Sequence, residues 1–89
     1  LLILGGGPIG LEMAQAHARL GCRVTVIEGA RIASRDDAEL VEGLRRVLLR
    51  EGVTLLEGAK LARVEPAHPG LIAELADGTR IDGSHLLLA

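Results

Sequence analysis

The fold of this 89-residue chain is decided by residues 1–10, LLILGGGPIG. The four aliphatic residues at the start predict a β-strand, and the glycines that follow form the pattern GxGxxG. In this pattern Gly5 permits the tight strand-to-helix turn, Gly7 permits a pyrophosphate to approach the backbone, and Gly10 permits the helix to pack on the strand. Pro8 suits the first position of a helix, because its fixed φ is helical and its missing N–H has no intrahelical partner there.

A helix that begins beside these glycines directs its free N–H groups and the positive end of its dipole at the turn. This end favours a negatively charged ligand. Gly5 and Gly10 also fit the GxxxxG of a nucleoside triphosphatase, but Leu11 and Glu12 stand where that motif requires Lys and Ser or Thr. The sequence therefore predicts a dinucleotide rather than a triphosphate.

The residues after the glycines support this interpretation, because GxGxxG alone is a weak signal in a chain with 12 glycines. A helix of about a dozen residues is predicted next, and Gly21 ends it. One stripe of this helix carries apolar residues at spacings of 4, 3 and 4, namely Ile9, Met13, Ala16 and Leu20.

Glu28 follows a second predicted strand at residues 23–27 and stands 18 positions after Gly10. At this distance the dinucleotide motif places an acid that accepts hydrogen bonds from the adenosine ribose hydroxyls. A 2′-phosphate about 4 Å from this carboxylate would be repelled by roughly 4 kcal/mol at an effective dielectric near 20. The sequence therefore predicts NAD(H) in preference to NADP(H). Arg31 is expected to be a solvated loop cation rather than a phosphate ligand.

The middle of the chain reads as a second helix and a third strand. Ser34, three positions before Asp37, resembles a capping box and predicts a helix that runs to about residue 51 and stops at Gly52. Residues 53–56 then form a strand and complete a βαβαβ unit. The helix is expected to bury one apolar face, made of Val41, Leu44 and Leu48.

The last third of the chain contains short predicted strands separated by turns, in place of alternating strands and helices. Asp77-Gly78 is a strong hairpin signal, and residues 66–70 form a second turn. The predicted strands are residues 60–65, 71–76, 79–82 and 86–89. The expected fold is thus α/β, a Rossmann-like three-layer domain with a parallel sheet of about four strands and an antiparallel β-meander as the crossover to the last strand.

Composition limits the classes of function. A length of 89 residues with 48% hydrophobic residues fits one domain that is marginally stable alone. The chain starts and ends inside predicted strands, so we expect it to be a piece of a longer protein. A net charge of −2 and the absence of aromatic residues argue against nucleic-acid binding. No stretch is long enough to cross a bilayer, and a cytoplasmic location is expected.

The single cysteine and the three histidines are not expected to carry chemistry. Cys22 excludes an internal disulfide, a CxxC pair and a zinc cluster, and it is expected to pack as a small hydrophobic residue. His17 is expected to be a partly exposed helix residue, while His68 lies in a turn and His85 borders the last strand. No metal site and no catalytic residue are predicted in this chain.

Together these segments resemble the NAD-binding domain of FAD-dependent pyridine nucleotide-disulfide oxidoreductases. The resemblance rests on GGGPIGLE at residues 5–12, VTVIE at residues 24–28, the meander and LLLA at residues 86–89. The dihydrolipoamide dehydrogenase and mercuric reductase branch is the most similar. The resemblance implies that residues 1–89 are one NAD(H)-binding domain that presents the nicotinamide to FAD for hydride transfer. It also implies an FAD domain in the same chain, a homodimer formed through another domain, and a catalytic His and redox Cys pair outside this segment.

The resemblance adds roles for particular residues. It places Glu12 near the nicotinamide and the flavin, and the backbone of Leu61 near the adenosine half. Pro8 stands where glutathione-reductase-like members often have a Tyr lid, so Ile9 becomes the expected apolar neighbour of the nicotinamide. The predicted cofactor-binding residues are Gly5, Gly6, Gly7, Pro8, Ile9, Gly10, Glu12, Glu28 and Leu61.

Two other functions fit the same motif. An FAD-binding Rossmann domain of an amine-oxidase-like flavoprotein shares the glycines and Glu28, although it usually carries an Arg and a Gly-Gly pair soon after the acid. A non-catalytic NAD-sensing module is the second alternative. A CxxxxC motif upstream would favour the oxidoreductase, and a regulatory neighbour would favour the sensor. The final electron acceptor stays open.

Overall fold

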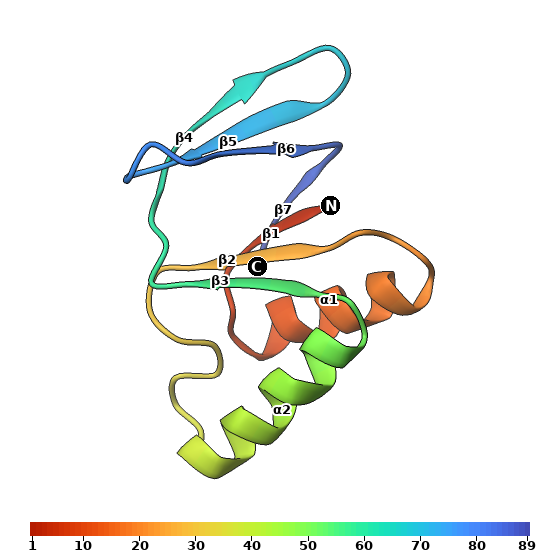
Figure 1. Ribbon diagram of the computed structural model, residues 1–89, viewed down its shortest axis with the longest axis vertical. Coiled ribbons are helices and arrows are strands. Elements are labelled where there is room, and N and C mark those ends of the chain that lie inside the picture. The colour runs from red at the N-terminus through yellow and green to blue at the C-terminus, as the bar shows by residue number, and fades with distance from the viewer.

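A four-stranded parallel sheet separates two helices from a three-stranded antiparallel sheet in the computed structural model, which describes residues 1–89 (Figure 1). This confirms the predicted Rossmann-like three-layer α/β fold, and the strand boundaries differ from the predicted ones by at most two residues. The elements are β1 (Leu2–Leu4), α1 (Pro8–Arg19), β2 (Thr25–Glu28), α2 (Ala38–Arg50), β3 (Thr54–Glu57), β4 (Leu61–Pro66), β5 (Leu71–Leu75), β6 (Arg80–Gly83) and β7 (Leu86–Leu88).

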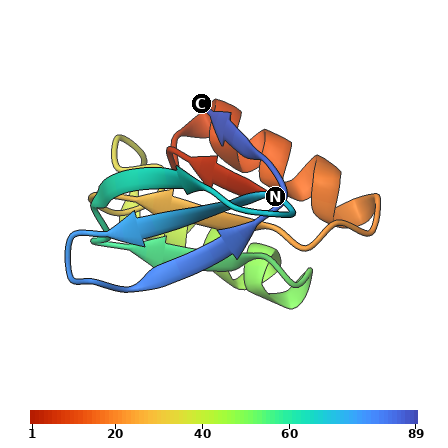
Figure 2. The same cartoon turned by 90° about the horizontal axis from the view of Figure 1, so that it is seen from above.

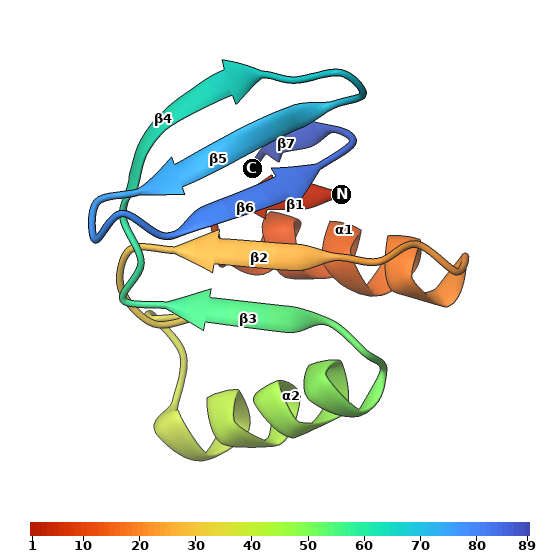
Figure 3. The same ribbon diagram turned by 45° about the horizontal axis from the view of Figure 1, so that its top comes forward.

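The parallel sheet has the strand order β3-β2-β1-β7, so the first and the last strand of the chain are neighbours (Figure 2). In register, Ile3 lies opposite Val26 on one side and Leu87 on the other. Strands β2 and β3 run side by side in the same direction (Figure 3), and both helices lie on the side of the sheet away from the meander (Figure 1). Because β1 is covered on both faces, its sequence is a continuous aliphatic run.

The core between the sheet and the helices contains ten buried residues. Ile3 and Val26 point into it from the sheet, and α2 contributes Val41 and Leu48. Leu44 packs against the same cluster while partly exposed. The predicted apolar face of the second helix is therefore confirmed.

The apolar stripe predicted for the first helix faces outward instead of into the core. Ile9 is 67% exposed and Leu20 is 80% exposed, whereas the buried residues of α1 are Gly10, Leu11 and Ala14. The reason is steric, because a Cβ atom at Gly10 would lie 2.0 Å from the Gly5 carbonyl oxygen. The backbone of Gly10 must therefore face β1. This contact fixes the rotation of α1 about its own axis, so the buried face of the helix is not the one that the apolar spacing predicts.

Helix α2 begins later than predicted. Asp37 is its N-cap, and the Oδ1 atom of Asp37 accepts a hydrogen bond of 2.9 Å from the N–H of Glu39. Ser34 lies in the turn that precedes the helix and does not cap it. Because Asp and Ser are both good caps, the two positions compete in the sequence. The helix ends as predicted, with Gly52 at a φ of +87°.

The meander covers the other face of the parallel sheet (Figure 1). Its order is β4-β5-β6, and Ala73 and Leu75 of β5 are buried with Leu2 and Ile27 of the parallel sheet. The predicted hairpin between β5 and β6 is confirmed. Gly78 has a φ of +91°, and the Asp77 carboxylate accepts a 2.9 Å hydrogen bond from the N–H of Thr79.

The exposed face of the meander carries four charged side chains in alternating ion pairs. Arg63 lies 2.9 Å from Glu65 and 2.9 Å from Glu74, and Arg80 lies 3.1 Å and 3.0 Å from the same two carboxylates. We call these four residues the charge ring. Its guanidinium and carboxylate groups neutralise one another at the surface.

Two further expectations can be compared with the structure. Cys22 is exposed, so the prediction that it packs as a small hydrophobic residue was wrong. It precedes β2 at the end of the sheet, where Val24 is the first buried residue. His17 is half-buried as expected, and its Nδ1 donates a 2.7 Å hydrogen bond to the Met13 carbonyl. Neither helix is long and apolar enough to span a membrane.

Candidate nucleotide site

The glycine loop between β1 and α1 is held by backbone hydrogen bonds on both sides. The N–H of Gly5 donates to the Ile27 carbonyl at 2.9 Å, and the Gly6 carbonyl accepts from the N–H of Ala33 at 2.8 Å. Gly5 has a φ of +118°, and a Cβ atom there would lie 2.8 Å from the Ala89 carbonyl oxygen. Only glycine fits this position, as the motif predicts.

The start of α1 presents three N–H groups that have no acceptor in the protein, those of Gly7, Ile9 and Gly10. Gly7 is the N-cap and offers no side chain, Pro8 fills the first helical position, and the first helical bond runs from Leu11 N–H to the Gly7 carbonyl at 3.0 Å. A Cβ atom at Gly7 would meet no atom within 4 Å. Unpaired donors next to open space can bind an anion, and the helix dipole adds to the attraction.

Glu28 lies directly against this loop, although it is 22 positions from Gly6 in the sequence. Its Oε1 accepts a 2.9 Å hydrogen bond from the N–H of Gly6, and its Oε2 accepts a 2.8 Å hydrogen bond from the N–H of Ala30. The side chain is half-buried. Each carboxylate oxygen keeps a second lone pair, so the group can still accept hydrogen bonds from ribose hydroxyls. The motif predicts the place of Glu28 but not its bond to Gly6.

A cavity of about 390 Å³ lies beyond Glu28, at the carboxyl end of β2 and β3. It is bounded by Gly29, by residues 57–60 and by residues 75–77 of the β5–β6 turn. Lys60 is a lining residue that the sequence analysis missed, because an isolated loop lysine carries no motif. Leu61 follows it at the start of β4 and is half-buried against the meander core.

The other predicted residues differ in how closely they join this group. Ile9 is exposed beside the loop, and Glu12 is exposed in α1 without a hydrogen bond or ion pair. Arg31 lies in the loop after β2, and its guanidinium donates 3.2 Å hydrogen bonds to the carbonyls of Ser34 and Asp36 at the surface. The structure thus brings the glycines and Glu28 together and leaves Glu12 and Leu61 at the periphery.

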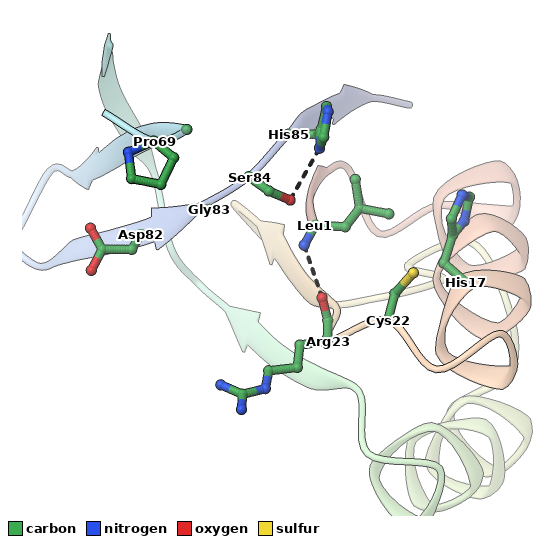
Figure 4. A pocket seen from close by; sticks show the side chains of 10 residues that line it. Leu1, His17, Cys22, Arg23, Pro69, Asp82, Gly83, Ser84 and His85 are labelled. Atoms are coloured by element: carbon green, nitrogen blue, oxygen red, sulfur yellow. Dashed lines mark hydrogen bonds between the residues drawn. The ribbon is translucent and has the colours of Figure 1, made fainter. Parts of the chain in front are cut away.

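A larger cavity, of about 960 Å³, lies at the opposite end of the sheet (Figure 4). It is lined by the residues before β1 and β2, the end of α1, and the turns of the meander. His85 lies 3.1 Å from the Ser84 hydroxyl, and no three His, Cys, Asp or Glu side chains are grouped to hold a metal ion. None of the predicted cofactor residues lies in this cavity. The larger size of this cavity is therefore no evidence that it binds the dinucleotide.

The comparison with known families decides which proteins this chain is related to. The profile of pyridine nucleotide-disulphide oxidoreductases matches residues 1–89, which is the whole chain. The chain belongs to this family. Family members are FAD-dependent oxidoreductases that use pyridine nucleotides.

Similar proteins agree with this family assignment. The chain is 44% identical over 92 aligned residues to mercuric reductase from Streptomyces lividans, covering all of the chain and 19% of that protein. It is 40% identical over 76 residues to dihydrolipoyl dehydrogenase from Chlorobaculum tepidum, covering 84% of the chain and 16% of the relative. The HOCl-induced flavoprotein disulfide reductase RclA from Escherichia coli superposes with a TM-score of 0.91 at 28% identity, covering 99% of the chain and 20% of that structure. The chain therefore spans about a fifth of the length of these oxidoreductases.

Proposed function

We propose that residues 1–89 form a single NAD(H)-binding domain that presents the nicotinamide to FAD for hydride transfer in a pyridine nucleotide-disulfide oxidoreductase. The observation that carries this proposal is the juxtaposition of the unpaired N–H groups of Gly7, Ile9 and Gly10 with the carboxylate of Glu28. The first group suits a pyrophosphate and the second suits ribose hydroxyls. A dinucleotide carries both on one molecule.

The proposed roles follow from the chemistry of each group. The pyrophosphate lies over Gly7, where the backbone is open, and accepts hydrogen bonds from the start of α1. Glu28 accepts from the adenosine ribose, so the adenosine half extends toward the 390 Å³ cavity and Leu61. The nicotinamide half extends past Pro8, Ile9 and Glu12. A 2′-phosphate would meet the Glu28 carboxylate, so NAD(H) is preferred to NADP(H).

The outward apolar stripe of α1 supports an FAD domain as the partner. Ile9 is 67% exposed, Met13 39% and Leu20 80%, and Leu88 of β7 is 72% exposed. An exposed apolar stripe along a helix favours contact with another protein surface. FAD, when bound to that domain, exchanges the hydride with the nicotinamide, while the present chain supplies binding and orientation. Homodimer formation through another domain stays a prediction from the family resemblance, and the cytoplasmic location stays a prediction from the sequence.

The test uses the full-length flavoprotein that contains this chain. Gly7→Ala adds a methyl group in open space at a φ of −81°, so the fold should persist while the pyrophosphate is displaced. We expect KM for NADH to rise at least about tenfold, equivalent to roughly 1.4 kcal/mol of lost binding, with the FAD content unchanged. Gly43→Ala is the matched control, because it adds the same methyl group in open space on α2.

The FAD-binding alternative predicts a different result for the same variant. If Gly7→Ala lowers the FAD content and leaves KM for NADH unchanged, the segment binds FAD and the proposal is wrong. Glu28→Gln tests nucleotide preference, because it removes the charge. Its single amide oxygen can accept from only one of Gly6 and Ala30, so the test compares the two nucleotides within the same variant. We expect the ratio of kcat/KM for NADH to that for NADPH to fall. A wild-type enzyme that uses both nucleotides equally well would refute the role of Glu28.

A further inference from the structure

We propose that Glu57, held by Arg45, is a positioning residue for the nucleotide site, because it fixes the segment between β2 and α2 against the glycine loop. This inference rests on the proposed function. Glu57 is the last residue of β3, and Arg45 lies in α2. Neither residue belongs to the dinucleotide motif, and neither touches the glycines directly.

The Glu57 carboxylate connects three parts of the chain. Arg45 binds it with two hydrogen bonds, from Nε to Oε1 at 2.7 Å and from Nη2 to Oε2 at 2.8 Å. The Oε2 atom also accepts a 3.0 Å hydrogen bond from the N–H of Ile32, in the segment between β2 and α2. Two parallel bonds from a guanidinium fix a carboxylate more tightly than a single ion pair does. Glu57 is therefore a fixed anchor for the backbone at Ile32.

From Ile32 the contacts lead directly to the glycine loop. Ile32 is fully buried, and its Cγ2 atom would lie 3.0 Å from a Cβ atom at Gly6, so its side chain packs closely on the bare backbone there. The next residue, Ala33, donates the 2.8 Å hydrogen bond to the Gly6 carbonyl. Gly6 in turn donates its own N–H to Glu28. A shift of the backbone at Ile32 would thus displace both the glycine loop and Glu28.

The backbone at Ala33 needs this support. Ala33 has a φ of +46° and is the only residue other than glycine with a positive φ in this chain. Such a conformation costs of order 1 kcal/mol or more and persists only when the surroundings enforce it. The bond from Ile32 to Glu57 on one side and the bond from Ala33 to Gly6 on the other hold it in place.

Arg45 has a second effect, on charge. Glu57 lines the 390 Å³ cavity beside Glu28, where a free carboxylate would repel a nucleotide phosphate. The bidentate hydrogen bonds from Arg45 lower the pKa of Glu57 below its ordinary value, so the pair stays ionised and internally neutral at physiological pH. Arg45 also contacts Glu42, which fixes its guanidinium on the helix. The carboxylate that lines the cavity is therefore paired with a cation, while the half-exposed Glu42, which does not line the cavity, carries the remaining negative charge of this group.

A matched pair of variants tests this inference in the full-length flavoprotein. Glu57→Gln keeps the size of the side chain, but its single carbonyl oxygen cannot serve Ile32 and both guanidinium nitrogens together. Glu51→Gln is the control, because Glu51 also accepts two hydrogen bonds from an arginine at the far end of the helices. Arg19 donates both to Oε1, at 3.1 Å and 2.9 Å, and Gln15 donates to Oε2 at 3.0 Å. A purely structural role predicts the same result for both variants.

We expect Glu57→Gln to raise KM for NADH about fivefold, within the range of effects for residues that do not touch a ligand, with kcat unchanged. Glu51→Gln should leave KM unchanged. Amide hydrogen exchange at residues 30–34 should be faster in Glu57→Gln and unchanged in Glu51→Gln. Arg45→Lys keeps one ion pair and should raise KM by less than Glu57→Gln does, which covers the case in which Glu57→Gln folds poorly.

The outcomes separate this inference from the proposed function. Equal KM values and equal exchange rates in the two glutamine variants would overturn the positioning role alone. A wild-type protein whose activity does not saturate with NADH would overturn the proposed function and the positioning role with it. A rise in KM with Glu57→Gln only, together with faster exchange at residues 30–34, would establish the positioning role.

Discussion

The two sides of the parallel sheet are packed in different ways. The helix side buries ten residues, among them Ile3, Val26 and Leu48, whereas the meander side buries four. The helix side also ends in the loop with unpaired N–H groups, while the outer face of the meander carries the self-neutralising charge ring. The comparison indicates that the helix side supplies most of the stability and the glycine loop of the candidate site. The meander covers the second face of the sheet, and its β5–β6 turn lines the cavity of about 390 Å³.

The largest expected effect on stability comes from replacing a glycine by alanine on each side of the sheet. Gly10→Ala places a Cβ atom 2.0 Å from the Gly5 carbonyl, in the packed contact between α1 and β1, and should destabilise the fold by about 3 kcal/mol. Gly70→Ala also meets a backbone carbonyl, that of Gly83 at 2.2 Å, and places alanine at a φ of +83°, but Gly70 lies in an exposed turn between β4 and β5, outside the packed layers. We expect about 1–2 kcal/mol there, measured by urea unfolding. Equal losses would contradict the comparison.

Truncation of one buried leucine on each side gives the next test. Leu48→Ala removes a side chain that is fully buried on the helix side, and should destabilise by about 3 kcal/mol. Leu75→Ala removes a side chain that is 6% exposed under the thinner meander, and about 2 kcal/mol is expected because that layer can close on the cavity. Thermal unfolding of both variants measures the difference. A larger loss for Leu75→Ala would reverse the assignment of the main core.

These two tests concern features that the sequence predicts to different degrees. The order of helices and strands, the meander and the place of Glu28 at the end of β2 all follow from periodicity, glycine positions and turn signals. The rotation of α1 does not, because Ile9, Met13 and Leu20 mark a stripe as regular as a buried one. The decisive constraint is the backbone contact between Gly10 and Gly5, which periodicity does not record.

The candidate site likewise contains some features that the sequence predicts and others that it does not. The motif predicts the glycines and the acid, since each has a fixed chemical role at a fixed spacing. It cannot predict that Glu28 holds Gly6, or that Glu57 holds Ile32, because these contacts join residues 22 and 25 positions apart through tertiary packing. The competition between Ser34 and Asp37 for the cap also depends on local geometry that residue type alone leaves undecided.

Capping of α2 gives an intermediate effect on the helix side. Asp37→Ala removes the acceptor for the N–H of Glu39 and should destabilise the fold by about 1 kcal/mol. Ser34→Ala should change stability by no more than about 0.5 kcal/mol, because Ser34 makes no cap. Denaturant unfolding of the two variants compares them directly. A loss with Ser34→Ala would show that the helix starts earlier in solution.

The smallest expected effect concerns the charge ring. Arg80 lowers the pKa of Glu65, so this pair stabilises the fold above the ordinary pKa of a glutamate, near 4.5, and loses that contribution as pH falls through the lowered value. Arg80→Met should therefore cause a small drop in Tm at pH 7 and a weaker dependence of Tm on pH below about pH 4.5. High salt should reduce the difference from the wild type, because the ring is exposed. A drop in Tm as large as that of Leu48→Ala would contradict the comparison.

The pairing of β1 with β7 has a consequence for how this unit is made. Leu2 lies beside Leu86 in register, so β1 gains its second neighbour from residues that are synthesised after all the other strands and helices of the domain. Until they arrive, one edge of β1 is bare and its hydrogen-bonding groups are open to strands of other molecules. Closing so long a stretch of chain is slow compared with forming either helix. A nascent chain stalled before Leu86 should therefore aggregate rather than wait in a nearly native state, which makes the pairing of β7 with β1 the step that commits the domain to folding.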